Sequence, residues 1–255
     1  MTNENLLKRI IPLPVRCWLR DREMRMERLI HRLRNRPDIG SLRRTTPVSI
    51  EWGLERGQVV VRYYIEKFLA EHAADVRGHV LEFSDDGYTR RFGGAQATKV
   101  DVLHLTDGNP CATIVADLEQ GGSIPSDTFD CIVCTQVFEY VYDLRAAIQT
   151  LYRILKPGGI VLVTVPGFQK FEGEEERDFW RFTSLSLRRL FEEAFPKDHL
   201  EVRTYGNVLT ATAFLYGLAV EDLRRQDLDY HDPEYEVMIT LRGVKPEALL
   251  SKREE

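Results

Sequence analysis

The chain has 255 residues, of which 43% are hydrophobic and 29% charged, and its formal net charge is −5. This composition is typical of a globular domain with a full hydrophobic core, and no apolar run approaches the roughly 18 residues of a membrane span. The N-terminal apolar patch is interrupted by charge too soon for a secretory signal, which favours a cytoplasmic protein.

The first 48 residues differ in charge from the rest of the chain. They contain twelve Lys and Arg against five Asp and Glu, a net of +7, so the remainder carries −12. Residues 5–36 are predicted to be helical, with a break at two prolines, and residues 37–48 form a linker. This basic segment could contact nucleic acid or an anionic membrane. We favour an amphipathic helix that packs on the protein or on a second subunit, giving a homodimer through the N-terminal helices.

Downstream of this segment, short apolar stretches alternate with helices. Such alternation is typical of a doubly wound parallel α/β sheet. The predicted strands are 79–83, 97–102, 112–116, 129–135, 159–165, 200–204 and 235–243, and the predicted helices are 56–74, 143–155, 184–195 and 208–223. Because no crossover helix follows the last strand, we predict that it runs antiparallel. The last five residues are predicted to be disordered.

Two of the four cysteines, Cys131 and Cys134, form a Cys-x-x-Cys motif inside a predicted strand. Residues three apart on a strand face opposite sides, so the two thiols are poor joint ligands for a metal ion. We therefore predict that they pack in the core and that the protein has no metal site. Free thiols also suit a reducing cytoplasm.

Two motifs carry a family resemblance. FDCIVCTQVFEY at 129–140, followed by LYRILKPGG at 151–159, resembles class I S-adenosylmethionine-dependent methyltransferases, and within them the type 11-like bacterial enzymes. The resemblance implies an α/β fold: a Rossmann-like, doubly wound seven-stranded sheet with a reversed last strand, at 76–250. Residues 1–75 would form a basic helical N-terminal extension and cap. S-adenosylmethionine is the implied cofactor.

The resemblance also assigns cofactor contacts to the carboxyl ends of the strands, where ligands of such sheets bind. Asp101, placed at the end of the second strand, would bond the ribose hydroxyls. Asp117 would take the adenine amino group, although either aspartate alone could be a solvated turn residue. The complete set of expected cofactor-binding residues is Glu82, Ser84, Asp85, Asp86, Tyr88, Asp101, Val102, Asp117, Leu118 and Gln136.

The loop after the first strand, FSDDGYTRRFGG at 83–94, departs from the family. Where relatives carry three glycines, this chain has Ser84, Asp86 and Tyr88. Two aspartates in this loop would repel a pyrophosphate, which argues against a dinucleotide. S-adenosylmethionine has no phosphate and carries two cationic groups, which an aspartate favours. Serine is small and aspartate tolerates left-handed backbone, so we predict that the loop still binds the cofactor.

The acceptor side is predicted from the segment that follows the fifth strand. Asp178, Trp180, Arg181 and Phe182 lie there and resemble segments of relatives encoded beside sugar-transferring enzymes. We therefore expect them to bind the acceptor, a saccharide or another small molecule. Trp180 could equally anchor its loop to the core.

Methyl transfer to a hydroxyl often uses a base whose pKa is near neutral. His231, in the connection into the last strand, is one candidate for this base. Glu139 and Tyr140, which follow the fourth strand, are the others.

These features predict an S-adenosylmethionine-dependent O-methyltransferase that acts on a saccharide or small secondary metabolite in a biosynthetic pathway. The glycine-poor loop leaves one alternative open: a catalytically inactive partner or scaffold protein of the same fold. Use of the cofactor for other chemistry is a third. Nucleic-acid methylation is disfavoured because the N/D-P-P-Y/F motif is absent and the domain is acidic.

Overall fold

The computed structural model describes residues 43–172 and 177–247, together with six single positions, residues 15, 19, 22, 23, 26 and 40. Two compact units make up the chain, Met1–Thr45 and Thr46–Glu255. Five of the single positions fall within the helix predicted at 5–36 and are helical. The rest of that helix and the last five residues lie outside the described part.

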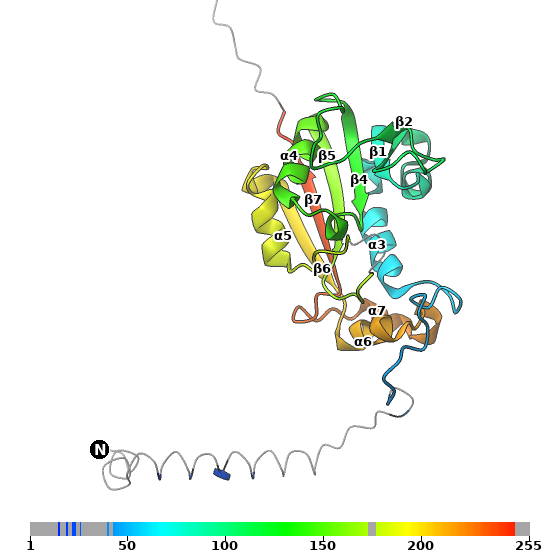
Figure 1. Ribbon diagram of the computed structural model, residues 1–255, viewed down its shortest axis with the longest axis vertical. Helices are drawn as coiled ribbons and strands as arrows, with labels where there is room; N and C mark the ends of the chain where they lie inside the picture. The colour runs from blue at the N-terminus through cyan, green and yellow to red at the C-terminus, as the bar shows by residue number, and fades with distance from the viewer. Residues whose placement is uncertain are drawn as a thin grey trace, which may run out of the picture. The chain divides into compact units, whose positions relative to one another are not determined.

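A seven-stranded sheet forms the centre of the second unit, in the order β3-β2-β1-β4-β5-β7-β6 (Figure 1). The strands are β1 Gly78–Phe83, β2 Ala97–His104, β3 Ile114–Val115, β4 Phe129–Thr135, β5 Leu155–Pro166, β6 Leu200–Tyr205 and β7 Met238–Val244. β1 to β5 are parallel, whereas β7 is antiparallel to both of its neighbours. The predicted sheet with a reversed last strand is thus confirmed. Its winding reverses between β1 and β4, where such sheets bind ligands.

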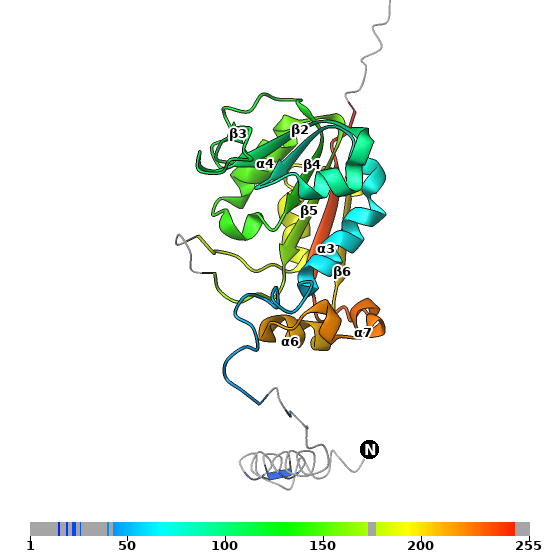
Figure 2. The ribbon, with the colours of Figure 1, turned by 90° about the vertical axis from the view of Figure 1, so that its right-hand side faces the viewer.

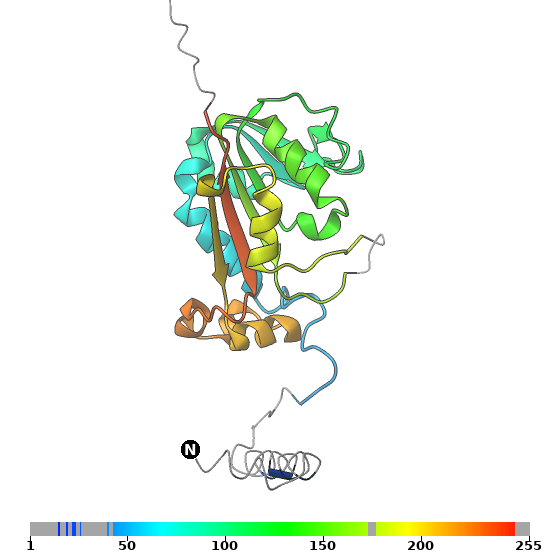
Figure 3. The ribbon, with the colours of Figure 1, turned by 90° about the vertical axis from the view of Figure 1, so that its left-hand side faces the viewer.

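Helices cover both faces of the sheet (Figures 2 and 3). They are α3 Val60–Glu71, α4 Leu144–Ile154, α5 Ser184–Phe191, α6 Val208–Tyr216 and α7 Arg225–Asp229. α4 and α5 share one hydrophobic core with the sheet, and α3, α6 and α7 share the other. Cys131 faces the second core and Cys134 the first, and both are buried. The prediction that the two thiols pack on opposite sides is confirmed.

Glycines set two helix boundaries that the apolar pattern misplaced. The helix predicted to start at residue 56 begins at Val60, because Gly53 and Gly57 adopt positive φ and hold the preceding residues in turns. The helix predicted to reach residue 223 ends at Tyr216. There Gly217 adopts the left-handed conformation, with φ of 67°, and caps the helix. Among the described residues no helix is long and apolar enough to cross a bilayer.

Candidate functional site

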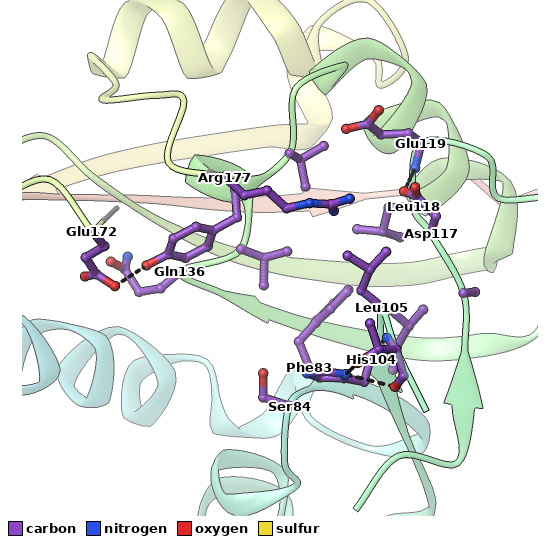
Figure 4. Close-up of a pocket in the computed structure, with 16 residues that line it drawn as sticks. Phe83, Ser84, His104, Leu105, Asp117, Leu118, Glu119, Gln136, Glu172 and Arg177 are labelled. Carbon is purple, nitrogen blue, oxygen red and sulfur yellow. Dashed lines mark hydrogen bonds between the residues drawn. The ribbon is translucent and has the colours of Figure 1, made fainter. Parts of the chain in front are cut away.

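A cavity of about 400 Å³ lies at the carboxyl ends of β1 to β4, and we call it the first pocket (Figure 4). Ser84 follows β1, His104 ends β2, Asp117 follows β3 and Gln136 follows β4. The volume of the first pocket is within the range of small-molecule binding sites. The full lining is Phe83, Ser84, Leu103, His104, Leu105, Thr106, Ala116, Asp117, Leu118, Glu119, Gln136, Val137, Tyr140, Val141, Glu172 and Arg177.

A second pocket, of about 380 Å³, adjoins the first and shares five of its residues, Phe83, Ser84, Gln136, Tyr140 and Glu172. Its other walls come from the turns before α3, from α3 and α6, from the ends of β1 and β4, from the loop after β1, and from the segments after β4 and β5. Those residues are Trp52, Leu54, Val59, Val61, Arg62, Ile65, Glu82, Asp85, Tyr88, Thr135, Glu139, Gln169 and Phe214. The shared walls make the two pockets parts of one crevice.

The loop after β1 makes its turn without the glycines of the family. Ser84 adopts a left-handed backbone with φ of 68°, and its amide donates to Leu103 O at 3.2 Å. Such a conformation costs a residue other than glycine about 1 kcal/mol. Asp85 then accepts a hydrogen bond from Gly87 N at 2.8 Å, which closes the turn. Ser84 and Asp85 therefore form this turn without the glycines that relatives carry there.

Glu82 fastens the same loop to the sheet. Its carboxylate is 2% exposed and accepts hydrogen bonds from Tyr88 N at 3.0 Å and Thr89 N at 2.7 Å. Burial raises the pKa of Glu82, and the amide donors oppose this effect. Asp86 pairs instead with Arg90 at 2.6 Å and lines neither pocket.

Most of the expected cofactor-binding residues meet in this crevice. Asp117, Leu118 and Gln136 line the first pocket, and Asp117 Oδ1 accepts from Glu119 N at 2.9 Å. Gln136 also lines the second pocket and, like Ser84, has a positive φ, of 52°. Backbone strain of this kind concentrates at functional sites.

Asp101 does not lie where the sequence pattern placed it. β2 continues for three residues beyond it, so the predicted strand-end position is wrong. Its carboxylate contacts His79 Nε2 at 2.6 Å, Thr113 Oγ1 at 2.8 Å and Lys99 Nζ at 3.1 Å. These donors lower the pKa of Asp101 against the effect of burial. Neither Asp101 nor the buried Val102 lines either pocket.

His104 occupies the strand end instead, and the sequence prediction missed it. Its imidazole lines the first pocket, with Nδ1 3.0 Å from Thr106 O. The alternation of Leu103 and Leu105 with polar residues was a signal that the strand extends this far.

Two of the three candidate bases lie at the second pocket. Glu139 is fully buried, and among the described residues neither of its carboxyl oxygens has a hydrogen-bond partner. Burial raises its pKa from 4.5 to about 8. The neighbouring Tyr140 donates its hydroxyl hydrogen to Glu172 Oε2 at 2.7 Å. Burial also raises the pKa of Tyr140.

His231 lies apart from these groups. It lines a different cavity together with Ser184 and Arg188, and its Nε2 is 2.8 Å from Thr204 Oγ1 on β6. The insertion of β7 between β5 and β6 carries this connection to the β6 side of the sheet. The structure therefore does not bring His231 together with the first or second pocket.

The residues expected to contact the acceptor line neither pocket either. Phe182 is 5% exposed and belongs to the hydrophobic core. Arg181 binds Asp178 and the carbonyl oxygens of Gln169 and Lys170, so the pair holds the two arms of its loop together. Trp180 donates from Nε1 to Val141 O at 2.9 Å. These contacts agree with the alternative in which Trp180 anchors the loop.

Among the described residues, no three His, Cys, Asp or Glu side chains gather in a way that would hold a metal ion. The two pockets present acids, amides and aromatic rings, together with the imidazole of His104 and the cations Arg62 and Arg177. Trp52 and Glu172 were not predicted as pocket residues. Trp52 comes from the turns before α3, and Glu172 lies six residues beyond the end of β5, in the segment from which later residues were predicted instead.

Residues 54–201 match a family described as a methyltransferase domain. A protein of Mycolicibacterium smegmatis named "Probable S-adenosylmethionine-dependent methyltransferase" is 28% identical over 149 residues, which are 58% of this chain and 45% of that protein. The match thus spans less than half of that relative.

Solved structures show the same fold at low identity. A SAM-dependent methyltransferase from Archaeoglobus fulgidus is similar with a TM-score of 0.50 and 11% identity, over 72% of this chain and 94% of the other. The cyclase SpnF has a TM-score of 0.50 and 15% identity, over 76% and 85%. The family match at residues 54–201 covers more than half of this chain. The chain therefore belongs to the class I S-adenosylmethionine-dependent methyltransferases, whose cofactor is S-adenosylmethionine.

Proposed function

We propose that the protein transfers the methyl group of S-adenosylmethionine to a hydroxyl of a small acceptor, a saccharide or a small secondary metabolite, bound in the second pocket. One observation carries this proposal: the first and second pockets share Ser84, Gln136 and Tyr140 as common walls. A cofactor whose adenosyl part lies in the first pocket and whose methionyl part extends past these residues towards Glu82 and Asp85 would therefore meet an acceptor in the rest of the second pocket.

The residues of the crevice fit this cofactor. Asp117 would hold the adenine amino group, and His104 ends the strand nearest the expected ribose site. Glu82 and Asp85 place negative charge beside the loop, which suits the ammonium and sulfonium of the ligand and would repel a phosphate. Arg62 is a cation on the opposite wall that could meet the carboxylate. When bound, the cofactor supplies an electrophilic methyl group.

Glu139 is the proposed proton acceptor. A hydroxyl that gains a methyl group must lose its proton, and general bases work best when their pKa is near the operating pH. The pKa of Glu139, about 8, meets this requirement, and its two carboxyl oxygens are free of partners among the described residues. The apolar walls Trp52, Ile65 and Phe214 would exclude water from the transfer.

Calorimetric titration with S-adenosylhomocysteine tests the first step, with micromolar binding as the expected result. Transfer of a labelled methyl group from S-adenosylmethionine into a mixture of saccharides and small metabolites tests the second. Glu139→Gln should still bind S-adenosylhomocysteine yet lose transfer. Absence of binding at millimolar ligand by the folded protein would support the inactive partner or scaffold instead.

The cytoplasmic, biosynthetic setting and the homodimer through the basic N-terminal helices remain proposals that rest on the sequence. Sedimentation of the full chain and of a variant lacking residues 1–42 checks the second of these. The full chain should sediment as a dimer and the shortened chain as a monomer.

A further inference from the structure

The second pocket has an uneven charge. Four carboxyl groups line it, those of Glu82, Asp85, Glu139 and Glu172, against one cationic side chain among its described residues, Arg62. Carboxylates that line one pocket repel one another and any anion that enters; Glu139, whose pKa is raised by burial to about 8, adds little of this charge at pH 7. The imbalance therefore bears on which acceptors the pocket can take.

The four carboxyl groups differ in their partners. Glu82 and Asp85 accept from backbone amides of the loop after β1 and so belong to the cofactor side. Glu139 has no hydrogen-bond partner in the described chain. Arg181, the cation whose charge acts on Glu139, is engaged by Asp178 and by backbone carbonyls.

Glu172 is held but not neutralised. Its Oε2 accepts from the hydroxyl of Tyr140 at 2.7 Å, and its Oε1 accepts from Gln169 Nε2 at 2.5 Å. Both donors are uncharged, so they orient the carboxylate and leave its negative charge in place. Figure 4 shows Glu172 beside Gln136, one of the walls that the two pockets share. A cationic group of a ligand would complete this arrangement through a charge-assisted hydrogen bond.

We propose that the acceptor carries a positively charged amino group that binds at Glu172, as in an amino sugar or an amino alcohol, and that phosphorylated or carboxylated acceptors are excluded. This inference rests on the proposed function, because it takes the second pocket as the acceptor site. It narrows the acceptor from small hydroxyl compounds in general to those that are cationic at neutral pH.

Three probes of nearly equal shape test the charge preference: benzylamine, benzyl alcohol and benzoate. Their rings suit the apolar walls formed by Trp52, Ile65 and Phe214. Affinities are measured by ligand-detected NMR on the full chain at pH 7, alone and saturated with S-adenosylhomocysteine. We expect benzylamine to bind at least about fivefold more tightly than benzyl alcohol, and benzoate to bind more weakly than either.

Glu172→Gln should weaken benzylamine binding about tenfold and leave benzyl alcohol unchanged. Glu193→Gln is the matched control, since Glu193 pairs with Arg145 on the surface and lines neither pocket. Equal or tighter binding of benzoate, no detectable preference among the probes, or an unchanged benzylamine affinity in Glu172→Gln would each overturn the inference. Failure of S-adenosylhomocysteine to bind would instead contradict the proposed function. The calorimetric titration measures this binding separately from the probe affinities.

Discussion

Replacement of Glu139 by glutamine should change how the stability of the protein depends on pH. Burial raises the pKa of this carboxyl from 4.5 to about 8, so between these values the folded protein keeps a proton that the unfolded chain releases. The wild type therefore loses stability as the pH rises. Between pH 5 and pH 8 the loss is about 3 to 4 kcal/mol, and the glutamine variant does not share it. The protonated wild-type carboxyl and the variant amide are both buried without partners among the described residues, so the cost of an unpaired polar group is nearly the same in the two proteins.

Urea unfolding at pH 5, 6.5 and 8 measures this difference in the free energy of unfolding. The variant should match the wild type within about 1 kcal/mol at pH 5 and be more stable by about 3 to 4 kcal/mol at pH 8, whereas the surface variant Glu193→Gln should follow the wild type throughout. A difference that stays constant with pH would refute the reasoning, because it would mean that Glu139 is already ionised in the folded state. In activity assays the wild-type rate should rise towards pH 8, and the variant should lose about 100-fold.

Substitutions at four further positions test the site. Ser84→Val should weaken S-adenosylhomocysteine binding at least about tenfold in calorimetry, since a β-branched residue resists the left-handed backbone, while Ser84→Gly should retain it; equal affinities would contradict this account of the loop. Asp101→Ala should change the affinity for S-adenosylhomocysteine by less than about threefold, whereas His104→Ala should reduce it about tenfold. A larger loss of affinity in Asp101→Ala than in His104→Ala would restore Asp101 as the ribose ligand. His231→Ala should keep turnover within about twofold of the wild type, and a loss of more than tenfold would place this histidine in the mechanism.

The sequence predicted the sheet well because its signals are local. Each buried strand is a short apolar run between polar turns, and the motif at 151–159 ends a helix and starts β5 within a few residues. The reversed last strand followed from the lack of a crossover helix after it. Boundaries were less accurate, since Gly217 ends α6 through a backbone conformation that an apolar pattern does not record.

The residues of the first pocket, the proposed cofactor site, were predicted in part. Gln136 follows β4 directly and Asp117 comes two residues after β3, so the strand pattern placed both correctly at the sheet edge. Asp101 was misplaced because pairing sets the end of β2: His104 still pairs with Val115 on β3, three residues beyond the aspartate. A polar residue in a partly exposed stretch of a strand is not a reliable sign that the strand ends there.

The residues of the second pocket, the proposed acceptor site, could not be predicted from local patterns. Trp52 comes from the turns before α3, Glu172 from the segment after β5 and Phe214 from α6, and these meet only through tertiary packing. The motif at 178–182 stood out in the sequence for a structural reason, since Arg181 and Trp180 bond the loop to its neighbours. The unusual residues of this motif therefore indicate a segment that anchors the loop.

The position of β7 has a consequence for how the chain is made. Within the described part of the chain, β6 bonds to no strand other than β7, and β7 also closes the free edge of β5. During synthesis β6 thus has no partner in the sheet, and β5 presents an open edge, until the residues up to Val244 have left the ribosome. Translation that stops short of β7 would leave β6 unpaired and one edge of β5 open, a species prone to associate with its own copies.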